Sequence, residues 1–426
     1  MEAAEIELRI LRLSKLGEGV AEHEGRTVFV EGALPGERVR VELDTSGKIW
    51  RGELREVLEA SAARRAPACS LSDRCGGCDW LHVDDPLQRE AKEEIVLSAL
   101  EHLGKIDRGE VTLLPSVPSP RAMSYRRRAV LHFAKQSLGF FARRSHECIP
   151  IERCPALANA LEDLPGRLAA VLGPARQGVE AVHLLSAGDK ASFALMLDGP
   201  VRPKLRELSE RAVRELELSG AVLVPKEGSP VLVGKPTLRI PAPLRPELPL
   251  YLRPDAFSQA NEEGNQALVA AAIDALQPTE TDRALELYSG NGNFTFALTG
   301  TVKDVVAVES STASVELARR SAQETRLPNV RFILGDARKV TEGLIAEGTK
   351  FDLLLADPPR TGAPGIAGWA RKLDVRRVVY VACDPGALAR DAAELKAAGF
   401  RPHTLQLVDM FPQTRHVEAV MAFSRA

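Results

Sequence analysis

The feature that most constrains the fold is a regular alternation of apolar runs and helical segments after about residue 255. Runs of strand length cover residues 284–288, 305–309, 330–334, 353–357 and 378–382. Helical segments, such as residues 314–324 and 385–398, lie between some of them. This alternation predicts a doubly wound, Rossmann-like parallel sheet, in which ligands bind outside the carboxyl ends of the strands. Two more runs, at residues 405–408 and 418–423, are expected to form a closing hairpin.

A glycine-containing turn, LELYSGNGNF, follows the first of these runs. Gly290 and Gly292 allow the backbone to approach a ligand closely, and the third glycine of the dinucleotide fingerprint is absent. The next three runs end near carboxylates, namely Glu309, Asp336 and Asp357. Glu309 suits a ribose diol, and Asp336 suits an adenine amino group. The pattern therefore predicts an adenosine ligand without a pyrophosphate, for which S-adenosylmethionine fits better than NAD.

Cys383, in YVACDPGALARD, ends the fifth run. Free cysteines are often buried and inert, so a structural role and a nucleophilic role are both open from this stretch alone. A helix that begins near Pro385 would direct N–H groups toward the sulfur and lower the pKa of the thiol. The charge of Asp384 would disfavour the thiolate unless a neighbour such as Arg390 neutralises it.

The other cysteines lie in the first half of the chain. The stretch ACSLSDRCGGC contains Cys69, Cys75 and Cys78, and either Cys148 or Cys154 is a candidate for a fourth ligand. Clustered cysteines of this kind predict a metal or cluster site rather than disulfide bonds. Four thiolates can hold zinc or an iron–sulfur cluster, and the spacing does not choose between them.

A local basic stretch lies between residues 121 and 144, which contain seven Lys and Arg residues and no acidic residue. Aromatic residues are interleaved with them, namely Tyr125, Phe133, Phe140 and Phe141. Basic groups neutralise phosphates and aromatic rings stack on unpaired bases, whereas the alternative is a solvated face with core aromatics. Short alternating runs before residue 60, such as residues 38–43, predict a small β-barrel upstream, and together the two features favour RNA.

Other stretches complete the expected organisation. A helix is predicted at residues 87–103, with strands at residues 128–133, 182–185 and 192–197. The proline-rich residues 241–254 are expected to be a linker. No apolar run reaches ~18 residues, so no membrane span is predicted, and the acidic start without a signal pattern predicts a cytoplasmic protein. The net charge of −2 does not by itself indicate a nucleic-acid partner.

Several motifs occur in a specific order along the chain: CSLSDRCGGC with RCP, YRRRA, FSQAN, LYSGNGNF, ADPPRTG, VACDPGALARD and FPQTRHVEAV. In this combination the chain resembles the bacterial RNA uracil-5-methyltransferases that use S-adenosylmethionine and carry a [4Fe–4S] cluster. The resemblance covers nearly the whole chain. It implies a TRAM-type, OB-like β-barrel at residues 1–62, a mixed central iron–sulfur and RNA-binding domain at residues 63–250, and a methyltransferase domain at residues 251–426.

The resemblance also implies roles for single residues. Cys383 matches the nucleophile and Glu418 the general base. The cluster ligands are matched by Cys69, Cys75, Cys78 and Cys154, whereas Cys148 is extra. The methyl donor is expected to contact Gln259, Tyr288, Asn293, Glu309 and Asp336, and Asp357 matches a position between the donor and the target base. The family usually has asparagine where Asp384 stands and cysteine or another small residue where Ser289 stands.

The implied activity is methylation of carbon 5 of a uridine in RNA. Ribosomal RNA is favoured over transfer RNA by the length of the chain and its N-terminal barrel, and a monomer is expected. Two other function classes are weighed against it. A small-molecule methyltransferase leaves the barrel and the basic stretch unexplained. A non-catalytic RNA-binding protein is permitted by the changes around Cys383, but the presence of Gln259, Asp357 and Glu418 argues against it.

Overall fold

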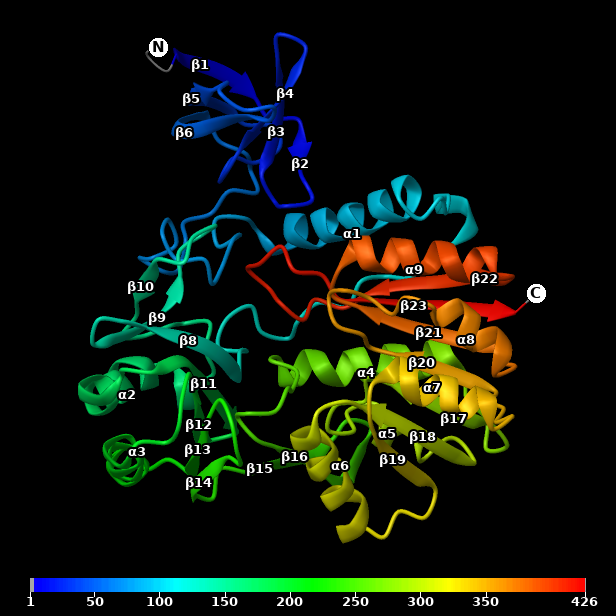
Figure 1. Cartoon of the computed structure of the whole chain (residues 1–426). Helices are drawn as coiled ribbons and strands as arrows, with labels where there is room; N and C mark the ends of the chain where they lie inside the picture. The colour runs from blue at the N-terminus through cyan, green and yellow to red at the C-terminus, as the bar shows by residue number, and fades with distance from the viewer. Residues whose placement is uncertain (1–3, 426) are drawn as a thin grey trace.

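The computed structural model describes residues 4–425, and its N-terminal part is a six-stranded sheet (Figure 1). Its strands are β1 (Ala4–Arg9), β2 (Arg12–Leu13), β3 (Gly19–His23), β4 (Arg26–Val30), β5 (Arg38–Asp44) and β6 (Trp50–Glu59). They pair in the order β1-β5-β6-β4-β3-β2 around a small apolar core. Within residues 4–425 no ladder joins β1 to β2, so the predicted barrel is an open sheet. The two-residue β2 is too short to bridge that gap.

The central part of the chain forms a seven-stranded sheet in the order β10-β9-β8-β11-β12-β13-β14. Its strands are β8 (Arg128–Ala134), β9 (Ser137–Phe141), β10 (Cys148–Pro150), β11 (Val179–Ala187), β12 (Lys190–Leu197), β13 (Gly220–Val224) and β14 (Val231–Gly234). Helices α2 (Leu164–Leu172) and α3 (Pro203–Glu215) bury their apolar faces against this sheet. Short 3-10 helices cover Arg108–Glu110, Asn159–Leu161 and Gly173–Ala175. The three predicted central strands are confirmed.

The predicted proline-rich linker is instead a β-hairpin, so that prediction was wrong. Strand β15 (Leu238–Ala242) pairs antiparallel with β16 (Arg245–Leu252), and Pro241 lies opposite Pro249. A two-stranded sheet has free edges on which a missing N–H costs little, so both prolines are tolerated. Alternate residues of β15 are buried against the C-terminal part, and this period of two was the signal that the proline content concealed.

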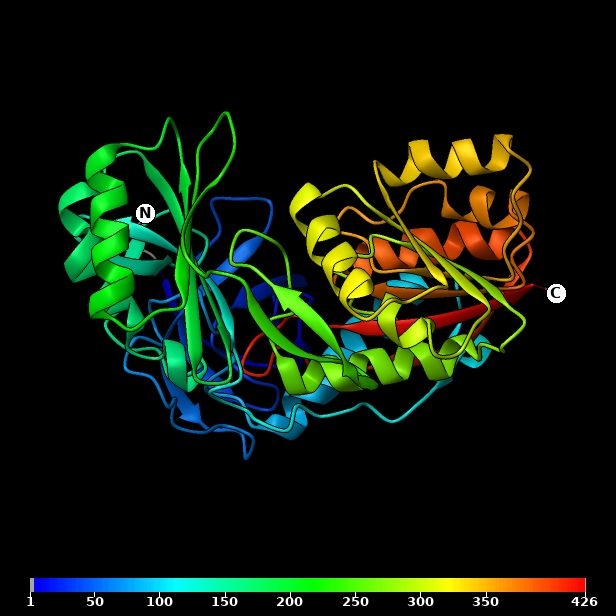
Figure 2. The same cartoon turned by 90° about the horizontal axis from the view of Figure 1, so that it is seen from below.

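The C-terminal part is an eight-stranded sheet in the order β19-β18-β17-β20-β21-β23-β22-β7. Its strands are β7 (Thr112–Leu113), β17 (Arg283–Leu287), β18 (Asp304–Glu309), β19 (Val330–Leu334), β20 (Leu353–Ala356), β21 (Arg377–Ala382), β22 (Phe400–Leu407) and β23 (Ala419–Arg425). Strands β17 to β21 are parallel, and β23 runs antiparallel to both neighbours, as the predicted closing hairpin requires. Figure 2 shows this part and the central part as two lobes.

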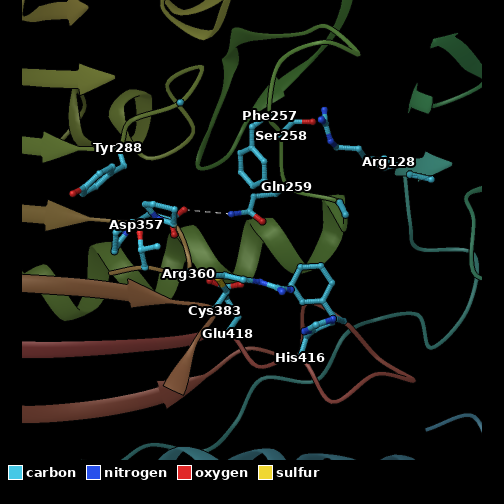
Figure 3. Close-up of a pocket in the computed structure, with 18 of the residues that line it drawn as sticks. Arg128, Phe257, Ser258, Gln259, Tyr288, Asp357, Arg360, Cys383, His416 and Glu418 are labelled. Carbon is cyan, nitrogen blue, oxygen red and sulfur yellow. Dashed lines mark hydrogen bonds between the residues drawn. The ribbon is translucent and has the colours of Figure 1, made fainter. Parts of the chain in front are cut away.

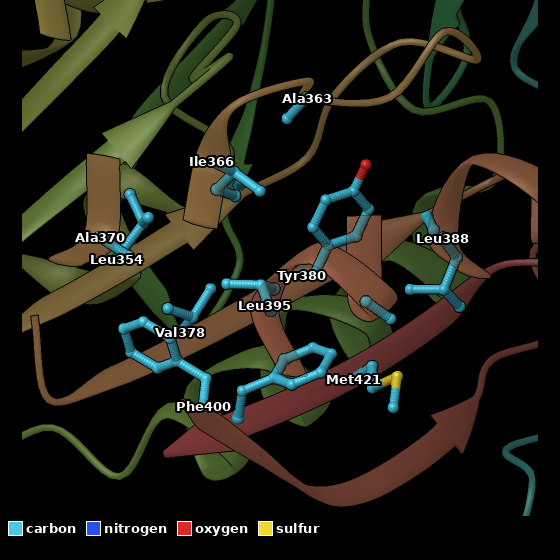
Figure 4. Packing of buried hydrophobic residues seen from close by; sticks show 14 of the residues in the cluster. Leu354, Ala363, Ile366, Ala370, Val378, Tyr380, Leu388, Leu395, Phe400 and Met421 are labelled. Atoms are coloured by element: carbon cyan, nitrogen blue, oxygen red, sulfur yellow. The ribbon is translucent and has the colours of Figure 1, made fainter. Parts of the chain in front are cut away.

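Helices cover both faces of the eight-stranded sheet. They are α4 (Glu262–Leu276), α5 (Thr295–Leu298), α6 (Thr312–Glu324), α7 (Ala337–Ala346), α8 (Ile366–Lys372) and α9 (Pro385–Ala397). Along β21, Val378 and Tyr380 pack toward α8 and α9 (Figure 4). Val379 and Val381 pack on the other face, toward α4. Burial on both faces explains why these strands read as continuous apolar runs rather than as alternating patterns.

One helix from the central range belongs physically to the C-terminal part. Helix α1 (Asp85–His102), which confirms the predicted helix at residues 87–103, packs beside α9 (Figure 1). Its Val96 and Leu100 join the same apolar core as Leu388 and Leu395 of α9. Strand β7 then pairs with β22 at the edge of the sheet. Within residues 4–425, none of the helices combines the length and apolar character needed to cross a bilayer.

Candidate functional site

The carboxyl ends of the parallel strands open into a cavity of about 1290 Å³ (Figure 3). It lies where the strand order reverses between β17 and β20, the usual ligand position in a doubly wound sheet. Its walls include all eight residues predicted for catalysis and donor binding: Gln259, Tyr288, Asn293, Glu309, Asp336, Asp357, Cys383 and Glu418. The cavity also reaches Glu31 of the N-terminal sheet, so all three parts of the chain border it.

Two of the predicted donor-binding carboxylates are fixed by backbone N–H groups. Glu309 accepts hydrogen bonds from the N–H of Gly290 at 2.9 Å and of Ser311 at 2.7 Å. Asp336 caps helix α7 by accepting from the N–H of Lys339 at 3.1 Å. Gly290 has φ +56°, the left-handed region that glycine adopts without strain. The two carboxylates are therefore held in place at the rim, where Asp336 is exposed to solvent.

Two further predicted donor contacts, Asn293 and Gln259, belong to separate groups of polar side chains. Asn293 exchanges two side-chain hydrogen bonds with Asn265 of α4, at 2.7 and 2.9 Å. Gln259 donates from Nε2 to Oδ2 of Asp357 at 3.4 Å, and its backbone carbonyl accepts from Nε of Arg127 at 2.8 Å. Gln259 thus connects the donor side of the cavity with Asp357 (Figure 3).

Unpartnered polar atoms on the cavity wall test whether a polar ligand fits. The buried hydroxyls of Ser258 and Ser289 have no hydrogen-bond partner within residues 4–425, and both residues line the cavity. Buried polar groups are almost always paired, so a polar ligand would satisfy them. A nucleoside with an amino-acid chain offers both hydroxyl and charged groups, and the polar residues of this wall fit S-adenosylmethionine.

Glu286 is a buried carboxyl that the sequence analysis did not single out. Its Oε2 accepts from the hydroxyl of Thr295 at 2.6 Å, whereas its Oε1 has no partner within the described residues. Burial raises the pKa of Glu286 to about 8, and repulsion from Asp357 and Glu309 adds to the rise. An acidic residue in the middle of an apolar strand was the signal that could have revealed it.

Strand pairing brings the predicted nucleophile and base together. In the antiparallel pair of β21 and β23, Ala382 lies opposite Ala419. Continuing this register by one residue places Cys383 opposite Glu418, and Figure 3 shows the two side chains next to each other. Residues separated by 35 positions in the sequence are thus neighbours because of the closing hairpin.

The thiol and the two nearby carboxyls raise one another's pKa. Burial raises the pKa of Cys383 to about 12, with further contributions from Glu418 and Asp357 that outweigh the opposing charge of Arg360. Burial also raises the pKa of Asp357 to about 7. For Glu418, burial followed by repulsion from Asp357 raises the pKa well above its ordinary range. The free protein therefore holds a protonated thiol beside two carboxyls, and a negative charge on one of these groups disfavours ionisation of the others.

Two expectations about the surroundings of Cys383 need correction. Helix α9 does begin at Pro385, but its N-terminus is occupied because Oδ1 of Asp384 accepts from the N–H of Ala387 at 2.8 Å. The predicted lowering of the thiol pKa is therefore wrong. Arg390 does not neutralise Asp384 either, because its guanidinium bonds Asp391 and the carbonyl of Thr361. Asp384 acts as a helix cap, a role that asparagine fills equally well.

Two further residues at the cavity were not predicted, although quoted motifs contain them. Arg360, in ADPPRTG, is exposed on the wall near Cys383 (Figure 3). His416, two residues before Glu418, packs edge-on against Phe411 with ring centroids 5.9 Å apart. Burial and then the charges of Arg360 and Arg415 lower the pKa of His416 to about 4, so its ring is neutral at pH 7.

The predicted cluster ligands converge on a second, small cavity of about 30 Å³. Its lining includes the thiols of Cys69, Cys75, Cys78 and Cys154. Cys148 does not line it, and its thiol donates instead to the carbonyl of His132 at 3.2 Å. Within residues 4–425, no three His, Cys, Asp or Glu side chains lie close enough together to hold a single metal ion.

The predicted basic stretch is only partly available to a phosphate. Arg127 points inward and is 3% exposed, whereas Arg126 lines both the cysteine cavity and the large cavity. Arg143 and Arg144 line the large cavity and pair with Glu31 and Glu18 of the N-terminal part. One of the seven cations, Arg127, is thus an internal support, which a sequence pattern cannot distinguish from a charged surface.

Comparison with known proteins identifies two regions by sequence. The family described as tRNA (Uracil-5-)-methyltransferase matches residues 248–426, and the TRAM domain matches residues 1–46. A protein of Shewanella baltica, named 23S rRNA (uracil(1939)-C(5))-methyltransferase RlmD, is 36% identical over 99% of this chain and 96% of its own length. Proteins of the same name from Shewanella frigidimarina and Mannheimia succiniciproducens are each 32% identical over the same shares.

Comparison with solved structures gives the same fold over the full length. The crystal structure of Pyrococcus abyssi tRNA (uracil-54, C5)-methyltransferase in complex with S-adenosyl-L-homocysteine aligns with a TM-score of 0.75. The alignment covers 98% of this chain and 99% of that one at 22% identity. The arrangement of the N-terminal sheet, central part and C-terminal sheet is therefore shared with a known methyltransferase.

Proposed function

Since the chain belongs to the family of RNA uracil-C5-methyltransferases, we propose that it methylates carbon 5 of a uridine in 23S rRNA. The observation that carries this proposal is the cavity in which Cys383 and Glu418 lie side by side next to the donor-side residues. Ribosomal RNA is favoured over transfer RNA because the relatives that match almost the whole chain at 32–36% identity carry the ribosomal name. The structure named for transfer RNA is 22% identical, so it supports the fold alone.

The proposed reaction begins with addition of the Cys383 thiolate to carbon 6 of the uracil, after the thiol has lost its proton to solvent. Carbon 5, now part of an enolate, attacks the methyl group that S-adenosylmethionine supplies on its sulfonium. Glu418 then takes the proton from carbon 5, the C5–C6 double bond re-forms, and the thiolate leaves. One proton is released overall, and the nucleophile is regenerated.

The environment of Glu418 suits this task. Its raised pKa makes the ionised carboxylate a stronger base than an exposed glutamate. Asp357, which Gln259 contacts, is proposed to hold the edge of the uracil between donor and nucleophile. Tyr288, Asn293, Glu309 and Asp336 are proposed to hold the donor. Arg360 is proposed to offset the negative charge that develops beside the thiol, since its charge already opposes the rise in the pKa of Cys383.

We further propose that Cys69, Cys75, Cys78 and Cys154 hold a [4Fe–4S] cluster that fixes the shape of an RNA-binding central domain. Convergence of the four thiols on one small cavity supports this ligand set. A single zinc ion requires sulfurs about 3.8 Å apart, whereas a cluster distributes its thiolates over four iron atoms. Four thiolates suit either group, and iron and sulfide analysis distinguishes a cluster from zinc. We also propose that the chain has three domains, at residues 1–62, 63–250 and 251–426. The protein is further proposed to be a monomer located in the cytoplasm.

The decisive experiment is mass spectrometry of RNA from a strain that lacks the gene. We expect 5-methyluridine to disappear from one position of 23S rRNA and to return when the wild-type chain, but not the Cys383→Ala variant, is supplied. Loss of 5-methyluridine from transfer RNA with unchanged 23S rRNA would overturn the ribosomal assignment. Iron and sulfide analysis of anaerobically purified protein tests the cluster separately.

A further inference from the structure

The segment that carries Glu418 is a long connection between β22 and β23. It comprises residues 408–418, and its two ends continue the β22–β23 pairing, because the N–H of Val408 donates to the carbonyl of Glu418 at 2.9 Å. Its remaining hydrogen bonds go largely to other parts of the chain. Two buried partners, Gln88 and Lys92, lie on α1, a helix that ends more than 300 residues before this connection begins.

Gln88 of α1 holds the middle of this connection. Gln88 is 1% exposed, and its Oε1 accepts from the N–H of Gln413 at 2.8 Å. Its Nε2 donates to Oε1 of Gln413 at 3.0 Å. Nε2 also donates to the carbonyls of Trp80 and Val83. Gln413 has φ +68°, a left-handed conformation that a non-glycine residue keeps only when its surroundings hold it there.

Lys92, one helical turn further along α1, holds the start of the connection. Its Nζ donates to Oδ1 of Asp409 at 2.7 Å and to the carbonyl of Phe411 at 2.9 Å. The lysine is 3% exposed and the aspartate 8%, so this is a buried ion pair. Removing one partner of such a pair is costly because the other charge is left buried and uncompensated.

The base therefore depends on more contacts than the nucleophile does. Cys383 directly follows β21, which is hydrogen-bonded on both sides within the sheet. The backbone of Glu418 also meets the sheet, but the connection before it is held by α1 together with Trp80, Tyr125 and Asn261, which bond the carbonyls of Gln413, Pro412 and Met410. Loosening the α1 contacts should shift Glu418 while leaving Cys383 in place.

We propose that Gln88 and Lys92 are positioning residues that hold Glu418 within reach of the carbon 5 proton. The inference rests on the proposed function of Glu418 as the base. If it is correct, weakening these contacts slows the elimination step more than the addition step. Misplacement of a catalytic group by about 1 Å can cost on the order of 100-fold in rate. The enzyme would then remain bound to methylated RNA through Cys383.

The test compares covalent enzyme–RNA adducts in denaturing gels, with unmodified 23S rRNA transcript as the probe. Gln88→Leu and Lys92→Met are expected to raise the adduct fraction at least fivefold over wild type and to slow turnover 10- to 100-fold. Gln88→Asn, which keeps the amide but shortens its reach to Gln413, is the milder variant for the case in which Gln88→Leu does not fold. Unchanged S-adenosylmethionine binding confirms that each variant retains its C-terminal fold.

A matched control distinguishes positioning from general destabilisation. Arg376→Met breaks a pair with Asp282, whose carboxylate is also 8% exposed although its arginine is 44% exposed, at the amino ends of β17 and β21. This variant should lose stability without accumulating adduct. The positioning role is overturned if Arg376→Met accumulates as much adduct as the α1 variants. It is also overturned if the α1 variants accumulate no adduct while Glu418→Gln does. In both cases the assignment of Glu418 as the base still holds. If Glu418→Gln itself forms no adduct, the base assignment and this inference are overturned together.

Discussion

The two sides of the large cavity treat their carboxylates differently. On the donor side, Glu309 and Asp336 accept hydrogen bonds from backbone N–H groups at the rim. On the base side, Asp357 and Glu418 are enclosed beside Cys383, and burial raises the pKa of all three groups. The same residue types are thus proposed to serve for binding at one side and for proton transfer at the other, and they differ in their degree of enclosure.

The largest expected effect comes from a substitution on the base side of the cavity, at Cys383. Cys383→Ala removes the nucleophile and should reduce methylation of 23S rRNA transcript by about 10⁴-fold or more, because the covalent route is closed. Donor affinity, measured by calorimetry, should stay within about twofold because the donor-side contacts do not involve the thiol. Cys148→Ala is the matched control and should retain activity. Turnover by Cys383→Ala at a tenth of the wild-type rate would contradict the nucleophile role.

The second largest effect separates addition of the thiolate to the uracil from removal of the carbon 5 proton. Glu418→Gln keeps the size of the side chain but cannot accept the carbon 5 proton, so turnover should fall by about 10² to 10⁴-fold. Because Cys383 still adds to the uracil, a covalent enzyme–RNA band should accumulate in a denaturing gel. The double variant Cys383→Ala/Glu418→Gln should show no such band. A band that persists in the double variant would show that the adduct does not involve Cys383.

The third effect concerns stability and pH. The folded-state pKa of Asp357 is raised to about 7 from an ordinary value of 3.8, so its contribution to stability is full below that ordinary value and is lost as the pH rises through 7. The side chain of the Asp357→Asn variant cannot ionise at this position. Between pH 4 and 8 the unfolding free energy of the variant should therefore fall by on the order of 2 kcal/mol less than that of the wild type. Urea denaturation at several pH values measures this. Parallel pH profiles for both proteins would contradict enclosure of this carboxyl.

The smallest effect perturbs the donor side. Glu309→Gln weakens the proposed hydrogen bond to the donor ribose and should raise the dissociation constant for S-adenosylmethionine about tenfold. At saturating donor, the covalent adduct formed by Glu309→Gln/Glu418→Gln should match that of Glu418→Gln. Glu342→Gln, on the exposed side of α7, is the control and should bind normally. A change in adduct yield at saturation would show that the two sides are not separate.

Much of the C-terminal sheet could be predicted from the sequence because strands buried on both faces give uninterrupted apolar runs. The predicted site residues also meet at one cavity, since most of them end or follow a parallel strand or precede β23, whereas Gln259 comes from the loop before α4. The hairpin at β15 and β16 was missed because proline content was weighed above a period of two. The local environment of Cys383 was missed for another reason. Whether Asp384 or a substrate takes up the N–H groups of α9 depends on side-chain geometry, not on the pattern.

Prediction from the sequence was also limited because a sequence pattern does not show which charged side chains are buried. The sequence YRRRA shows three cations in a row, but Arg127 supports Gln259 from inside while Arg128 reaches the cavity. Likewise, nothing near Gln88 or Lys92 indicates that both side chains meet a segment more than 300 residues away. Long-range hydrogen bonds of this kind leave no periodic trace in a single sequence.

The packing of α1 against α9 has a consequence for synthesis of the chain. At ~5–20 residues per second, the ribosome completes α1 on the order of tens of seconds before α9 exists. During that interval Val96 and Leu100 have no apolar partner from the C-terminal sheet, whose core they later share. For most of translation the apolar side of α1 therefore lacks its partner in the C-terminal core, and the large cavity is completed only when the last strand has been synthesised.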